Sequence, residues 1–158
     1  MTRTVLLALW LLSTTATAAE SLSLQNLSVV RGDGVRVELE VEVASSEAQR
    51  RHGLMGRRAL AARAGMLFDF HTSMTVTMWM KDTPLSLDML FIDAAGQVVW
   101  ISERTVPESP ALISAPQPVR FVLELASGEV RRWGLAVGDR VLLPGSAAGV
   151  SAERRPRL

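Results

Sequence analysis

The sequence predicts a mainly β protein, a small β-sandwich or open barrel of about eight strands with two or three short helices. Apolar and polar residues alternate strictly over the nine residues from Val35 to Val43, which is typical of a half-buried antiparallel strand. Further short apolar runs follow, separated by glycine and proline turn signals. After removal of 19 N-terminal residues the 158-residue chain retains 139, enough for one domain with its own core.

The first 19 residues have the three-part pattern of a cleavable secretory signal. Arg3 supplies the positive charge, Val5 to Leu12 are apolar, and small residues follow from Ala16 to Ala19. Spanning a bilayer takes about 20 apolar residues, so this run is too short for an anchor. We therefore expect a periplasmic or secreted protein without a transmembrane segment in its mature form. The expected organisation is a signal peptide at 1–19, one β-rich domain at 20–144 and a disordered tail at 145–158.

The first two strands are expected to form a hairpin. Residues Leu22 to Val30 and Val35 to Val43 flank the turn sequence Gly32-Asp33-Gly34, and such spacing favours antiparallel pairing. The glutamates of the second strand all point to one face, which is most simply a face in contact with solvent.

Three short helical segments are expected. Ser46 followed by Gln49 is a capping-box pattern, which predicts a helix over Glu47 to His52 ended by Gly53. A second helical segment is predicted over residues 57–64, closed by Gly65. A third is predicted over residues 129–133, capped by Ser127 and ended by Gly134.

The remaining strands follow from apolar runs bounded by turns. They are predicted at residues 66–70, 75–80, 87–92, 97–101, 119–125 and 140–143. Ala94-Ala95-Gly96 makes a hairpin of the third and fourth of these. A proline-rich loop spans residues 102–118, and loops of that length in compact domains are often functional.

Charge and cysteine content exclude several classes of function. The chain has 17 basic and 16 acidic side chains, and loss of Arg3 with the signal leaves 16 of each. This balance gives no indication of a polyanionic partner, and no nucleic acid is expected. The chain has no cysteine, which excludes thiolate metal sites and cysteine nucleophiles.

Three ordered blocks resemble a known family of bacterial and archaeal proteins. They are GLMGRRALAARAGMLFDF at residues 53–70, MWMKDTPLSLDMLFID at 78–93 and VRFVLELASGEVRRWGLAVGD at 119–139. Together they are similar to the family called domain of unknown function 192, over roughly residues 35–143. The resemblance implies a β-sandwich-like fold and no particular activity.

The sequence departs from the family pattern at three positions. The usual phenylalanine and asparagine of the second block are here Met78 and Asp82, and the proline-cysteine pair of many relatives is Pro107 followed by Glu108. A role proposed for that cysteine therefore does not apply to this chain.

The main candidate site surrounds the one lysine of the chain, Lys81, which interrupts an otherwise apolar segment. Nearby polar residues suggest a cluster that binds an unknown small molecule or envelope component. The candidate ligand-binding residues are Arg57, Lys81, Asp82, Asp88 and Glu124. The alternative is a structural ion pair, or a lysine whose stem covers apolar surface.

Arginines are dense in the segment that precedes this site. Arg50, Arg51, Arg57, Arg58 and Arg63 lie within fourteen residues. Such a group of fixed charges suits phosphate or carboxylate groups, although the same pattern is typical of a solvated helix surface.

Two further functions stay open. Thioether and imidazole groups suit Cu(I), and the methionine-rich region 55–89 offers His71, Met78 and Met80 as alternative metal ligands for a copper carrier. Methionine is equally a flexible core filler.

No catalytic residue stands out, because neither histidine lies in an HExxH motif and no GxSxG elbow exists. A small envelope hydrolase would depend on an acid such as Asp88. A binding or accessory module without a cofactor is the leading hypothesis.

Overall fold

The computed structural model describes residues 21–143 of the chain. The predicted signal peptide at 1–19 and the predicted tail at 145–158 lie outside the described residues. Within the described part, no helix has the length and apolar character to cross a membrane.

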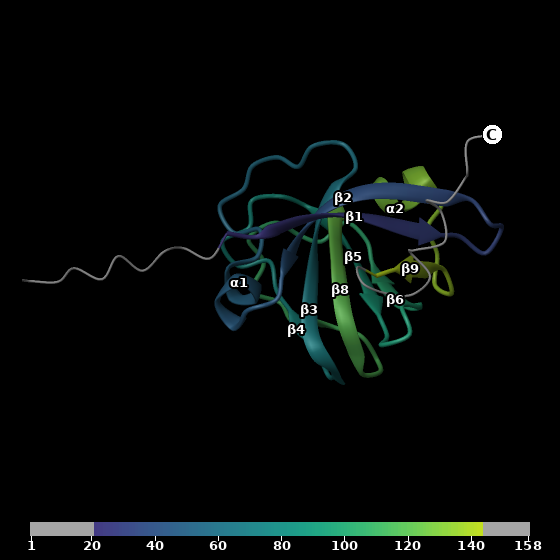
Figure 1. Cartoon of the computed structure of the whole chain (residues 1–158). Helices are drawn as coiled ribbons and strands as arrows, with labels where there is room; N and C mark the ends of the chain where they lie inside the picture. The colour runs from purple at the N-terminus through teal and green to yellow at the C-terminus, as the bar shows by residue number, and fades with distance from the viewer. Residues whose placement is uncertain (1–20, 144–158) are drawn as a thin grey trace, which may run out of the picture.

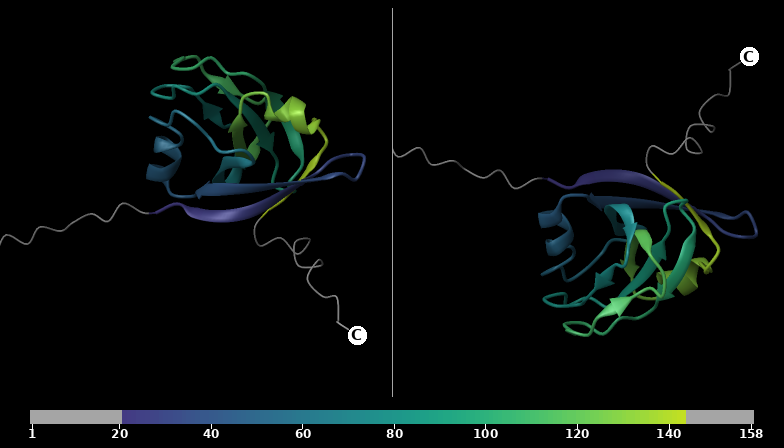
Figure 2. Two further views of the ribbon diagram at one scale, coloured as in Figure 1. Left: turned by 90° about the horizontal axis from the view of Figure 1, so that it is seen from above. Right: turned by 90° about the horizontal axis from the view of Figure 1, so that it is seen from below.

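Seven strands form one strongly curved sheet that almost closes on itself, in the order β6-β5-β8-β3-β2-β1-β9 (Figures 1 and 2). The strands of this sheet are β1 (Ser23–Val30), β2 (Arg36–Ala44), β3 (Ala64–Met74), β5 (Leu87–Ile92), β6 (Val98–Ser102), β8 (Val119–Ala126) and β9 (Arg140–Leu142). A second sheet pairs β4 (Thr77–Met78) with β7 (Ile113–Ser114), and the helices are α1 (Glu47–His52) and α2 (Glu129–Trp133). The prediction of a mainly β, barrel-like fold is confirmed.

The two edges of the sheet meet through a few hydrogen bonds. The backbone N–H of Val98 donates to the carbonyl of Asp139 over 2.8 Å, and that of Val141 donates to Gly96 over 2.7 Å. An isolated bridge between Gln97 and Arg140 lies beside them. Closure of this kind leaves little unpaired sheet edge.

The curved sheet separates two apolar cores. All seven of its strands contribute to the interior of the barrel, where Leu39, Leu67 and Leu123 are among the buried residues. The outer cluster covers the opposite face of β3, β5 and β8 and contains Phe68 and Phe91. All six residues of β5 are buried because the strand is covered on both faces.

Helix α1 forms where the capping pattern predicts it. Gln49 donates its backbone N–H to the Ser46 hydroxyl over 3.2 Å, and the Gln49 side chain accepts from the Ser46 N–H over 3.0 Å. These reciprocal bonds satisfy donors that a helix start otherwise leaves free. The predicted β1–β2 hairpin and the hairpin around residues 94–96 are also confirmed.

The helix predicted at residues 57–64 is wrong. This stretch is an irregular connection that reaches β3, which already begins at Ala64. β2 and β3 pair in parallel, so the chain between them must cross back over the length of the paired segment. Gly56, with φ of 74°, turns the chain out of helical geometry, and its N–H donates to the carbonyl of Asp82 over 2.8 Å.

The predicted cap of α2 is also wrong. Gly128, not Ser127, occupies the N-cap, and its lack of a side chain leaves the first turn without a local acceptor. The carboxylate of Asp88 on β5 supplies it instead, accepting the N–H groups of Gly128 over 2.9 Å and Val130 over 3.0 Å. The cap therefore comes from a residue 40 positions earlier in the chain.

The segment predicted as a strand at 75–80 keeps only the two residues of β4. Its partner β7 lies inside the proline-rich loop, so this loop is partly ordered by strand pairing. The β4–β7 pair covers the outer cluster beside β3.

Candidate functional site

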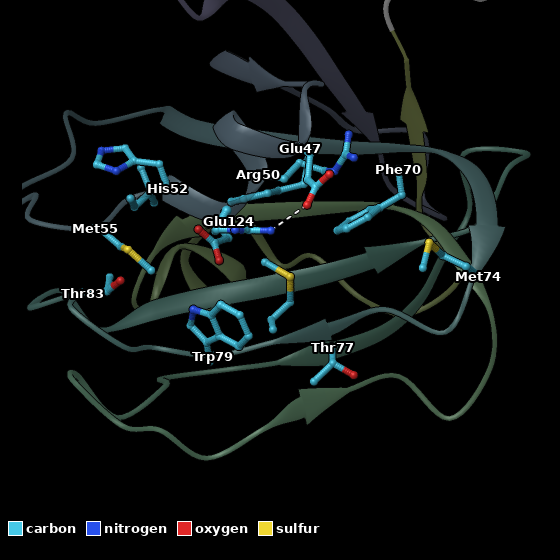
Figure 3. Close-up of a pocket in the computed structure, with 15 residues that line it drawn as sticks. Glu47, Arg50, His52, Met55, Phe70, Met74, Thr77, Trp79, Thr83 and Glu124 are labelled. Carbon is cyan, nitrogen blue, oxygen red and sulfur yellow. Dashed lines mark hydrogen bonds and ion pairs between the residues drawn. The ribbon is translucent and has the colours of Figure 1, made fainter. Parts of the chain in front are cut away.

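A pocket opens on the outer face of the sheet, between α1 and the β4 segment (Figure 3). Its volume is about 300 Å³. Helix α1 and the turn after it form one wall, β3 and β4 form the others, and β8 reaches its floor. We call it the Glu124 pocket, lined by Glu47, Arg50, Arg51, His52, Gly53, Leu54, Met55, Phe68, Phe70, Met74, Thr77, Met78, Trp79, Thr83 and Glu124.

Glu124 is the buried polar group of this pocket. On β8 it lies in register between Met66 of β3 and Met89 of β5, both fully buried. The Glu124 residue is 4% exposed, and burial raises the pKa of its carboxyl to about 8. Among residues 21–143, none hydrogen-bonds to this carboxyl or pairs with it. At neutral pH the group is therefore protonated, with one O–H donor and one carbonyl acceptor available to the pocket.

Three aromatic and three thioether side chains contribute to the pocket walls. Figure 3 shows Met55, Thr83 and Trp79 at the same end as Glu124, whereas Phe70 and Met74 lie at the other end. The apolar floor is contiguous with the outer cluster, which holds it in place. A concave lining that combines apolar side chains with polar groups is typical of small-molecule sites.

Charged groups at the rim are neutralised or engaged. Arg51 contacts Glu47 over 2.6 Å within α1. Arg50 donates to the carbonyl oxygens of Ser45 and Asp69, and its guanidinium lies 5.4 Å from the centre of the Phe70 ring. The rim therefore carries no large excess of either charge.

A second, more open hollow adjoins the Glu124 pocket. We call it the Lys81 groove, lined by Glu47, Ala48, Arg51, His52, Met55, Trp79, Lys81 and Asp82. Trp79 lines both hollows and is 43% exposed. The two hollows therefore share a wall.

The family model for domain of unknown function 192, described as "Uncharacterized ACR", matches residues 28–143. The chain belongs to this family. The sequence resemblance is thereby confirmed, and it extends from β1 to the end of β9. No curated protein matches the chain.

Two solved structures of similar proteins share the fold of this family member. A candidate transcription regulator from Sinorhizobium meliloti 1021 is 45% identical, with a TM-score of 0.75, over 77% of this chain and 94% of the other. A protein of unknown function from Novosphingobium aromaticivorans is 30% identical, with a TM-score of 0.74, over 77% of this chain and 86% of the other.

The structure separates the five predicted ligand-binding residues of this family member into four places. Glu124 lines the pocket, and Lys81 and Asp82 line the adjoining groove. Arg57 lies outside both hollows in a two-pronged contact with Glu42, one prong of which measures 2.8 Å. That hydrogen bond raises the pKa of Arg57 above its already high value.

Asp88 faces away from the pocket. It is fully buried, and its carboxylate accepts from the backbone N–H groups of Arg104, Gly128 and Val130 over 2.9–3.0 Å. These bonds give Asp88 a structural role in the fold.

The three alternative copper ligands lie in different surroundings. Met80 is 1% exposed within the outer cluster, Met78 lines the Glu124 pocket, and His71 lines a separate hollow beside Ser45. A nitrogen of the His71 ring lies 2.9 Å from the Ser45 carbonyl. Over residues 21–143, no group of three or more His, Cys, Asp or Glu side chains is arranged to hold a metal ion.

Sequence reasoning missed Trp79 and Met55 as site residues. Both lie in the most family-like part of the chain, where an apolar residue is most simply interpreted as core. Strand β4 ends at Met78, so Trp79 lies outside the sheet and is partly exposed. The sequence predicted a longer strand that would have included Trp79.

Proposed function

We propose that this domain is an exported binding module that takes up a small organic molecule in the Glu124 pocket. The observation that carries the proposal is Glu124 itself, a buried carboxyl in a preformed pocket with no partner among residues 21–143. Buried polar groups in proteins are nearly always hydrogen-bonded, and the exceptions call for an explanation.

An unsatisfied buried group has an energetic cost. Leaving a donor or acceptor without a partner costs about 1–3 kcal/mol, and the same amount becomes available when a partner arrives. A ligand that hydrogen-bonds to Glu124 while covering Phe68 and Phe70 would satisfy the carboxyl and remove apolar surface from water. The pocket is thus better suited to a bound molecule than to solvent.

Binding is better supported than acid-dependent hydrolysis. A substrate could not reach the Asp88 carboxylate, because this group is fully buried and accepts three backbone hydrogen bonds. The other acid of the pocket, Glu47, is engaged by Arg51. Of the two acids that line the pocket, only Glu124 is therefore without a partner in the described part of the chain.

Export is supported by the sequence pattern of residues 1–19.

The description of the S. meliloti relative would suggest a role on nucleic acid. The net charge of the described residues does not support such a role. Of 17 basic side chains, Arg3, Arg154, Arg155 and Arg157 lie outside residues 21–143, which leaves 13. Of 16 acidic side chains, Glu20 and Glu153 lie outside, which leaves 14. Nucleic-acid-binding domains ordinarily carry a marked positive excess.

Native mass spectrometry of the protein, purified gently from its own host, tests the proposal. We expect a small organic adduct on a chain that begins near Ala19 or Glu20. Glu124→Leu should lose the adduct, because leucine fills similar space without a hydrogen bond. Glu40→Leu replaces an exposed glutamate on β2 and should retain it. An adduct that persists in the Glu124 variant would place the ligand elsewhere, and a chain that keeps residues 1–19 would contradict export.

A further inference from the structure

We infer that the ligand is a neutral saccharide of at least two rings, with one ring in the Glu124 pocket and the next against Trp79 in the Lys81 groove. This inference rests on the proposed function, because it names the class of molecule that the same site binds. Three features carry it: the adjacency of the two hollows, the partly exposed tryptophan that lines both, and the small net charge of their lining.

The two hollows adjoin each other closely enough to serve one extended ligand. They share five lining residues, which are Glu47, Arg51, His52, Met55 and Trp79. The pocket volume of about 300 Å³ lies at the small end of the range of ligand pockets, so we assign it a single sugar ring. A ligand that also contacts Lys81 must therefore extend beyond the pocket.

Trp79 presents a flat apolar face at the junction. It is 43% exposed, which places it among the exposed large apolar residues of the described chain. Figure 3 shows its indole ring at the same end of the pocket as Glu124. A sugar ring has one face made of C–H groups, which packs on an indole, and hydroxyls around its edge, which need polar partners. Trp79 and Glu124 together offer both kinds of contact.

The ionisable groups of the lining favour a neutral ligand. Glu47 and Arg51 neutralise each other, and Glu124 is uncharged because of its burial. Lys81 and Asp82 add one charge of each sign to the groove. Arg50 adds one positive charge, and its guanidinium already donates to the carbonyl oxygens of Ser45 and Asp69. A cationic ligand would therefore lack a countercharge, and a phosphate group would meet an excess of only this one engaged guanidinium. Hydroxyls, by contrast, both donate to carboxyls and accept from arginine and lysine.

Titration with neutral saccharides tests the inference. The protein is the full chain, purified from its own host after any processing there. The probes are cellotriose, maltotriose, triacetylchitotriose and neutral glycan fragments released from the host's own envelope. We expect at least one of them to shift the NMR signal of the Trp79 indole N–H. Its affinity should exceed that of the matching monosaccharide at least tenfold.

Variants separate the two parts of the site. Trp79→Ala should weaken the affinity tenfold or more, and Trp79→Phe should restore part of the loss because it retains an aromatic face. Glu124→Leu should weaken the affinity by a similar factor. Leu112→Ala removes a side chain of a residue that is 71% exposed and lines neither hollow, so it should leave the affinity unchanged. Unfolding midpoints confirm that each variant is folded.

The outcomes distinguish this inference from the proposed function. If no saccharide binds but the native adduct persists and depends on Glu124, the ligand class is wrong and the binding function stands. If neither an adduct nor a saccharide binds, both fail. Saccharide binding that is unaffected by Trp79→Ala would overturn the groove as part of the site.

Discussion

Asp88 and Glu124 are buried carboxyls on neighbouring strands that project to opposite faces of the same sheet. In the pairing of β5 with β8, Asp88 lies opposite Leu125 and Met89 lies opposite Glu124. Asp88 accepts three backbone N–H groups, whereas Glu124 has no partner among residues 21–143. Two acids with almost the same burial therefore have different surroundings: one accepts hydrogen bonds that hold the fold together, and the other has no partner in the described part of the chain.

Glu124→Gln should change how the stability of the ligand-free protein depends on pH. Below pH 4.5 the carboxyl is protonated in both the folded and unfolded chain and contributes no pH dependence. Between pH 4.5 and about 8 the unfolded chain loses this proton while the folded chain retains it, so stability falls as pH rises, by about 1 kcal/mol per pH unit. Above that range both forms are ionised and the cost is constant.

The measurement is urea denaturation of wild type and variant from pH 4 to pH 9. The difference in unfolding free energy should increase in favour of Glu124→Gln across this window, because glutamine does not ionise. Glu40→Gln changes an exposed glutamate and should follow the wild-type curve. Parallel curves for wild type and Glu124→Gln would show that Glu124 has an ordinary pKa.

Asp88→Ala should lower the free energy of unfolding by about 3 kcal/mol or more. Three backbone N–H groups, on Arg104, Gly128 and Val130, would lose their acceptor at once. Asp88→Asn keeps one carbonyl oxygen and should cost less. Chemical denaturation measures both, and circular dichroism follows α2. If Asp88→Ala abolished ligand binding in protein that was still fully folded, the structural role would be contradicted.

The sequence predicted the local elements well because their signals are local. The capping box at Ser46 and the alternation in β2 depend on residues a few positions apart, and both elements form where expected. The predicted helix at 57–64 failed because the parallel pairing of β2 with β3 determines the path of that segment. Such pairing joins residues distant in the chain and overrides local propensity.

The candidate site was predictable only in part. Glu124 is the one acid within the apolar run VRFVLEL at residues 119–125 and is among the predicted ligand-binding residues, and the structure places it in the pocket. Asp88 has the same sequence character and faces the other way. Strand periodicity tells which residues share a face of the sheet. It does not tell whether backbone N–H groups or a cavity will lie against that face. That depends on where α2 and α1 pack against the sheet.

Arg57 should prove to be a structural residue. Its two-pronged contact with Glu42 joins the irregular connection to β2, and both side chains are partly exposed. Arg57→Ala should therefore cost about 1 kcal/mol or less and leave ligand affinity unchanged. A double-mutant cycle with Glu42→Ala measures the coupling of the pair, with Lys81→Ala as the comparison for binding. A tenfold loss of affinity in Arg57→Ala would instead place this arginine in the site.

Gly65→Ala should damage both stability and the pocket, because β3 approaches β8 closely at this point. A Cβ atom at Gly65 would lie 2.5 Å from the backbone oxygen of Glu124 and 2.9 Å from a methyl carbon of Leu125. The backbone cannot yield without moving Glu124, so we expect a loss of about 1–3 kcal/mol and weaker binding. Gly32→Ala is the matched control, since no atom lies within 4 Å of its added Cβ. Thermal unfolding should show little change there, and equal effects at the two glycines would refute the close approach as the cause.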